Sequence, residues 1–155
     1  MALTAEAVLK DCEFALACLE SEDDRRRFKL LWMAAVAGLR SVGHVLKNVD
    51  GAHEPQIKRA AASAFARWKT DREKHKISWD FIEDERNALL KEARRGVLAI
   101  PYDLMAGKQR HSFDFQIYAP MVDGPYGGED CRDVLKLAII WWKRELKERK
   151  RDAET

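Results

Sequence analysis

Apolar residues recur every three or four positions along most of the chain, a spacing that predicts amphipathic α-helices. Thr4 can cap the first helix, and Pro55 is acceptable in the first turn of the third. The second helix is apolar nearly all round, which is typical of a central helix, and its Gly38 and Gly43 permit a neighbouring helix to approach closely. The pattern predicts five helices, over about residues 4–20, 22–49, 54–68, 78–96 and 130–146.

The periodicity changes between about residues 100 and 128. Residues 112–118 alternate in the period of a strand, and residues 123–128 are rich in turn-forming glycine and proline. We therefore expect an irregular insertion or a short β-hairpin that covers one end of the helices. Beyond Leu146 only charged and short polar residues remain, so residues 147–155 are expected to fray.

These segments together predict a single domain over residues 1–155. Its fold class is all-α, an up-and-down bundle of about five helices with the insertion before the last helix. A chain of 155 residues can bury roughly 70% of its unfolded surface, which is enough for one substantial core.

Composition restricts the function only weakly. Charged residues make up 35% of the chain and the net charge is +2, so nucleic-acid binding is neither demanded nor excluded. No apolar run reaches the roughly 18 residues of a membrane span and the N-terminus lacks a signal-peptide pattern, so we expect a cytoplasmic protein without a membrane partner. The three cysteines lack metal-ligand spacing and are expected to be reduced packing residues, and we expect no metal and no cofactor.

Arg86 interrupts the expected inward stripe of the fourth helix, which otherwise reads Trp79, Ile82 and Leu89. A guanidinium inside an apolar stripe must find partners, because an unpaired buried charge is costly. One interpretation is an anion site, in which Asn87 adds directed donors. The other is a buried ion pair that holds the helices together, with a carboxylate such as Glu83, Glu13 or Asp11.

Two further basic residues complete the candidate site. Lys91 lies one helical turn beyond Asn87, so the two side chains can face one ligand. If the second and fourth helices pack together, Arg40 can share a cleft with Arg86 and form a two-arginine phosphate clamp. Solvated or ion-paired arginines are the alternative. Phe81 projects almost opposite Arg86, which indicates an apolar residue outside the core and a possible dimer face.

The stretch 78–92, with Arg86, Asn87 and Lys91, resembles the third-helix signature of HEPN-like proteins. In that all-helical family an Arg, usually followed by a polar residue, precedes a His by four to six positions. The resemblance extends over about residues 25–95, through residues 39–42 (Leu-Arg-Ser-Val) and 65–68 (Phe-Ala-Arg-Trp). In catalytic members it implies a metal-free ribonuclease centre at a dimer interface. Lys91 stands where the shortest version of the motif has His, and lysine is a poor general base at neutral pH.

The resemblance therefore implies a homodimer with the Arg86 helix near the two-fold axis. It also implies a binding or regulatory module for RNA, a nucleotide or a protein partner, in a bacterial defence or toxin–antitoxin setting, rather than an enzyme. Two alternatives stay open. One is a metal-independent ribonuclease that uses Arg86 with Lys91 or His111 as the substitute base, and the other is a structural interaction protein.

Overall fold

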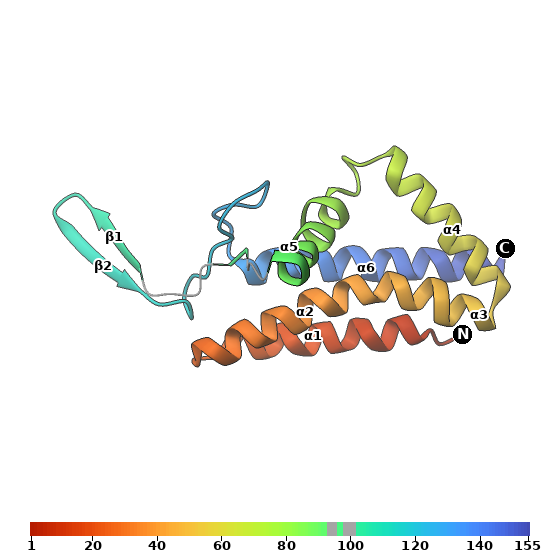
Figure 1. Ribbon diagram of the computed structural model, residues 1–155, viewed down its shortest axis with the longest axis horizontal. Coiled ribbons are helices and arrows are strands. Elements are labelled where there is room, and N and C mark those ends of the chain that lie inside the picture. Colours follow the sequence, from red (N-terminus) through yellow and green to blue (C-terminus); the bar gives the residue numbers. More distant parts are fainter. Residues whose placement is uncertain (93–95, 98–101) are drawn as a thin grey trace.

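The computed structural model describes residues 1–92, 96–97 and 102–155, and it is an all-α bundle with a small two-stranded sheet before the last helix, as predicted (Figure 1). No described helix has an apolar stretch long enough to cross a membrane. The helices are α1 (Thr4–Ser21), α2 (Arg25–Val45), α3 (Gly51–His53), α4 (Pro55–Thr70), α5 (Asp84–Glu92) and α6 (Cys131–Glu154), with two π-helical segments, η1 (Leu46–Asp50) and η2 (Ser78–Glu83).

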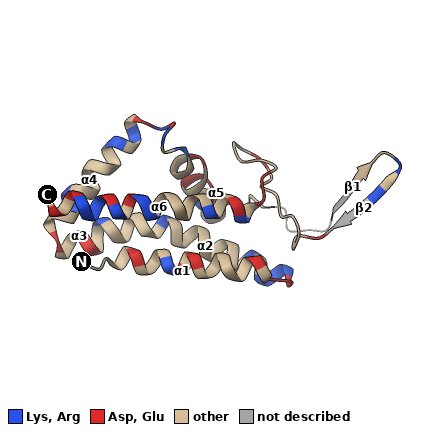
Figure 2. Cartoon of the chain, turned by 180° about the vertical axis from the view of Figure 1, so that it is seen from behind, with Lys and Arg blue, Asp and Glu red and all other residues tan. Residues whose placement is uncertain are grey.

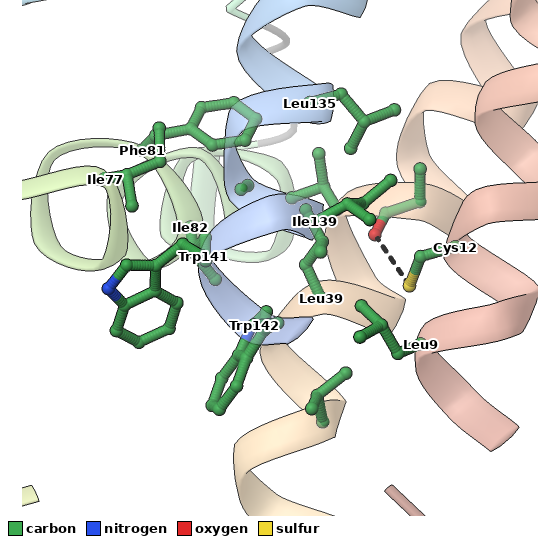
Figure 3. Close-up of a cluster of buried hydrophobic side chains, with 14 of the residues drawn as sticks. Leu9, Cys12, Leu39, Ile77, Phe81, Ile82, Leu135, Ile139, Trp141 and Trp142 are labelled. Carbon is green, nitrogen blue, oxygen red and sulfur yellow. Dashed lines mark hydrogen bonds between the residues drawn. The ribbon is translucent and has the colours of Figure 1, made fainter. Parts of the chain in front are cut away.

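Helices α1, α2 and α6 lie side by side along the long axis, while α4 and α5 lie on one side of this layer (Figure 1). Side chains from α1, α2, η2 and α6 meet in one apolar cluster, part of which is shown in Figure 3. Both expected close approaches at glycine are present. A Cβ on Gly38 would lie 2.7 Å from Cys12 Sγ in α1, and one on Gly43 would lie 3.0 Å from Trp142 Cη2 in α6.

The first helix is capped by a residue from elsewhere in the chain. Asp50 is buried and its carboxylate accepts from Thr4 N at 2.8 Å and from Ala5 N at 3.0 Å. The prediction that Thr4 itself caps α1 is therefore wrong. A carboxylate is suited to this place because it satisfies two free amides at the positive end of the helix dipole.

The second helix starts and ends a few residues later than expected. It continues from α2 through η1 into α3, so that helical backbone runs from Arg25 to His53. The continuation is what brings Asp50 to the start of α1, because the same turn packs against both α1 and α4.

The helix that carries Arg86 turns a different face to the core than expected, and its buried face is shifted by one residue. Phe81, Ile82 and Glu85 are buried, whereas Arg86 is half-buried at the edge of the stripe. The cause is η2, because a π-helical turn closes i→i+5 hydrogen bonds and rotates every later residue relative to an α-helix. Phe81 packs on Trp32 with ring centroids 5.7 Å apart, so it belongs to the core and does not indicate a dimer face.

The insertion forms a hairpin of β1 (Tyr102–Ala106) and β2 (Gln109–Phe113), paired antiparallel around Gly107 at φ +64°. It points away from the helices rather than covering their end (Figure 1). The expected strand over residues 112–118 is cut short at Phe113, and Phe115 turns back to pack on Phe28 with ring centroids 5.1 Å apart. The part of the insertion that covers the bundle therefore begins after β2.

The chain end is helical, so the prediction that residues 147–155 fray is wrong. Helix α6 continues to Glu154, with alternating basic and acidic residues along its final turns (Figure 2). Arg149 is 1% exposed and pairs with Glu145, Glu148 and Asp152. These pairs and the burial of Arg149 stabilise the last turns.

Candidate functional site

A basic cleft of about 520 Å³ lies where α2, η1, α4 and α5 meet. Helix α2 and η1 supply one wall, and the spacing of 40, 44 and 47 puts three of their polar residues on one helical face. Helix α4 supplies a second wall and Arg86 of α5 closes the cleft. Its polar and aromatic lining consists of Arg40, Ser41, His44, Lys47, Asn48, Phe65, Lys69 and Arg86.

The charge of this lining has one sign. Arg40, Lys47, Lys69 and Arg86 are basic, and no Asp or Glu is among the lining residues of the described chain. Low-dielectric walls concentrate the potential of such a cluster, and guanidinium forks match the geometry of phosphate and carboxylate oxygens. The arrangement suits an anion.

Arg40 and Arg86 share this cleft, as the sequence predicted for helices that pack together. Arg86 Nη1 donates to Asn87 Oδ1 at 2.7 Å. The Nε of Arg40 is buried and has no hydrogen-bond partner among the described residues. Within those residues no carboxylate pairs with either guanidinium, which contradicts the interpretation of Arg86 as a buried ion pair with Glu83, Glu13 or Asp11.

Asn87, another predicted site residue, is not among the residues that line the basic cleft. Asn87 lines a separate cavity of about 280 Å³, between α5 and residues 121–126. Its contribution to Arg86 is therefore to orient the guanidinium through their hydrogen bond, not to contact the same ligand. Lys91 lies in α5, and its side chain falls outside the described part of the structure.

A histidine does line the cleft, but it is neither of the predicted substitute bases. His44 Nδ1 is 3.1 Å from the amide nitrogen of Asn48, and both side chains are exposed at the cleft. His111 lies in β2, on the hairpin that points away from the helices, and does not reach the cleft. The sequence could have identified His44 as a cleft residue, because it lies four positions after Arg40 on the same helical face, as does Lys47 one turn later.

The buried charges that the sequence led us to expect at Arg86 are found elsewhere. Glu85 is 6% exposed and accepts from Trp32 Nε1 at 3.0 Å and from Gly96 N at 2.7 Å. Glu145 accepts from Trp68 Nε1 at 3.0 Å and pairs with Arg149. Both carboxylates are satisfied by the fold itself, so they are structural groups.

His75 lies in the same buried network, in the turn between α4 and η2. Its Nδ1 accepts from Trp141 Nε1 at 3.2 Å. Burial lowers the pKa of His75 below the ordinary value, partly opposed by Glu145, whose Oε1 is 3.8 Å away. The ring is therefore neutral at neutral pH and acts as an acceptor within the core.

Two of the three cysteines, Cys12 and Cys131, are buried. All three cysteines are free, and burial raises the pKa of Cys12 to about 12, so that thiol stays protonated and packs as an apolar group. In the described ranges no three His, Cys, Asp or Glu residues converge in a way that could hold a metal ion.

Comparisons with known protein families, with curated proteins and with solved structures gave no match to this chain. The chemistry of the basic cleft is therefore the basis on which a function is inferred.

Proposed function

We propose that this chain is a HEPN-like binding module without catalytic activity, whose basic cleft holds a phosphate group of RNA or of a nucleotide. The observation that carries the proposal is the sharing of one cleft by Arg40, Lys47, Lys69 and Arg86 without a lining carboxylate. The regulatory setting implied by the resemblance, bacterial defence or a toxin–antitoxin system, is part of the same proposal.

The energetics of the cleft favour binding of an anion from solution. Arg40 and Arg86 are both half-buried, so part of their desolvation is already complete before a ligand arrives. Hydrogen bonds to charged groups contribute about 1.5–3 kcal/mol each, and guanidinium groups can make two to one phosphate. Lys47 and Lys69 are exposed at the rim and add attraction that depends on salt.

The test is the double variant Arg40→Ala/Arg86→Ala, titrated with single-stranded RNA and with AMP by calorimetry. We expect affinity to fall about a hundredfold or more, because two charge-assisted contacts are removed. The matched control is Arg25→Ala/Arg26→Ala, which removes two exposed arginines at the start of α2, outside the cleft. Equal losses in the two double variants, or no loss in either, would show that the cleft is not the binding site.

A metal-independent ribonuclease is the second candidate, because His44 and Arg86 line the same cleft. His44 supplies an imidazole in the cleft, the side chain that most often serves as general acid or base in enzymes. Incubation of the wild type, Arg86→Ala and His44→Ala with single-stranded RNA in the presence of a chelator separates the candidates. Cleavage by the wild type that both variants lose supports the ribonuclease, and intact RNA supports the binding module.

The homodimer also belongs to this proposal. It rests on the resemblance, and light scattering of the purified wild type measures it directly. Large exposed apolar side chains that a second copy could cover include Phe14 on α1 and Leu137 and Ile140 on α6.

A further inference from the structure

A second pocket, of about 220 Å³, adjoins the basic cleft and has mainly aromatic walls. The two cavities share Arg40, Phe65 and Lys69, so they lie next to each other. We call it the aromatic pocket; its ring walls are Phe65, Trp68, Trp79 and Trp142.

The rings of the aromatic pocket are held in place by their neighbours. Trp79 Nε1 donates to Trp68 O at 3.0 Å, and the Arg72 guanidinium lies 4.6 Å from the Trp79 ring centroid. Phe65 packs edge-on against Trp68 with centroids 4.7 Å apart. Because these side chains are already fixed, a flat ligand would bind without ordering them first.

The aromatic pocket is lined by hydrogen-bond donors as well as by a carboxylate. Trp142 is 3% exposed, and its buried indole N–H has no acceptor among the described residues. The buried Nε of Arg40 is in the same condition. An acceptor on a ligand would satisfy such donors, whose burial otherwise costs free energy.

Glu83 supplies the hydrogen-bond acceptor of the aromatic pocket. It is half-buried at the end of η2, lines the aromatic pocket and makes no ion pair within the described chain. An ionised carboxylate can only accept, so it favours a ligand group that carries hydrogens, such as an exocyclic amine. The same pairing lets Glu recognise the amino group of a base in nucleic acids.

We propose that the aromatic pocket receives the base of a nucleoside phosphate whose phosphate lies in the basic cleft, and that Glu83 selects bases with an amino group. The inference rests on the proposed function, since it needs a phosphate in the cleft. Aromatic walls next to four cations are complementary to a flat ring joined to an anion. A base in this pocket is unpaired, so the ligand is a free nucleotide or a nucleotide within a single strand.

The test compares three probes by calorimetry, ribose 5-phosphate, purine riboside 5′-phosphate and AMP. AMP differs from purine riboside 5′-phosphate only by its amino group, and ribose 5-phosphate lacks the base. We expect AMP to bind about tenfold or more tighter than ribose 5-phosphate, because base–aromatic stacking is strong. Purine riboside 5′-phosphate is expected to lie between them.

Two variants assign these differences to residues. Glu83→Ala is expected to remove the preference for AMP over purine riboside 5′-phosphate, and the exposed Glu73→Ala is expected to keep it. Trp79→Ala is expected to bring AMP to the affinity of ribose 5-phosphate. Unchanged binding of ribose 5-phosphate shows that the cleft of each variant is intact.

The outcomes separate the two proposals. Ribose 5-phosphate and AMP binding equally would overturn the base pocket and leave the phosphate cleft standing, whereas no binding by any probe would overturn both. Oligoadenylate distinguishes the two sources of the base, a free nucleotide and a nucleotide within a single strand. An abasic strand of equal length is the control for contacts to the backbone alone. A preference for oligoadenylate over AMP indicates RNA, and equal affinities indicate a free nucleotide.

Discussion

Arg149 is the most completely buried basic side chain of the described structure, with 1% exposure. Its guanidinium lies 3.4 Å from Glu145, 3.1 Å from Glu148 and 3.2 Å from Asp152. Arg86 pairs with no carboxylate among the described residues, and it lies at the edge of the basic cleft. A buried arginine is tolerated where carboxylates surround it, and an unpaired one stays within reach of solvent or ligand.

At this scale we predict that Arg149→Met lowers the free energy of unfolding by about 3–5 kcal/mol, because it removes the buried charge partner of Glu145 and leaves only the exposed Arg144. Urea unfolding followed by circular dichroism measures the change. The control is Arg151→Met, an exposed residue on the same helix, which should change stability by no more than about 0.5 kcal/mol. If both variants lower the free energy of unfolding by similarly small amounts, the desolvation of Arg149 offsets the stabilisation from its ion pairs.

The helices depend on groups outside their own sequence. Asp50 of η1 caps α1, and the wider turn of η2 sets which residues of α5 face the core. Asp24 and Asp130, in contrast, cap the helices that immediately follow them. Local caps can be read from the sequence, whereas a cap donated from a distant turn cannot.

At the scale of elements we predict that Asp50→Ala lowers the free energy of unfolding by about 1–2 kcal/mol or more, since loss of an N-cap costs this much and two buried amides lose their acceptor. Thr4→Ala is the matched control and should be nearly neutral, because Thr4 is exposed and its side chain does not cap α1. Thermal unfolding of both variants distinguishes them. A larger loss in Thr4→Ala would restore the cap predicted from the sequence.

At the scale of the whole molecule, the network around His75 joins two segments that lie far apart in the sequence. The ring accepts from Trp141 of α6, stands near Glu145 and Arg144 of the same helix, and follows Asp71 and Lys74 in its own turn. Protonation would replace an acceptor by a donor facing the Trp141 N–H. The turn between α4 and η2 is therefore coupled to α6 through a group that titrates.

From this coupling we predict that the molecule loses stability as pH falls below about 6.5, the ordinary pKa of histidine. Burial lowers the pKa of His75 in the folded state, so between the folded and unfolded pKa values the unfolded chain binds more protons. Acid then favours unfolding. Urea unfolding from pH 7.5 to 5 measures the slope.

His75→Gln should remove most of this slope, and the exposed His53→Gln should retain it. Glu6 and Asp130 also have lowered pKa values, but their contributions are lost only below the ordinary values of 4.5 and 3.8. A wild type and His75→Gln with parallel profiles would exclude His75 as the source.

The sequence by itself determined the helices and the position of the insertion, which follow from periods and turn residues within single segments. It proposed a cleft shared by Arg40 and Arg86 only on the condition that the second and fourth helices pack together, and tertiary structure met that condition. Tertiary structure alone decided the phase of the Arg86 helix, the cap from Asp50, the burial of Arg149 and the place of His44, Lys47 and Lys69 around the cleft. The physical reason is that a period defines a face but not its partner, and a single π-helical turn rotates that face.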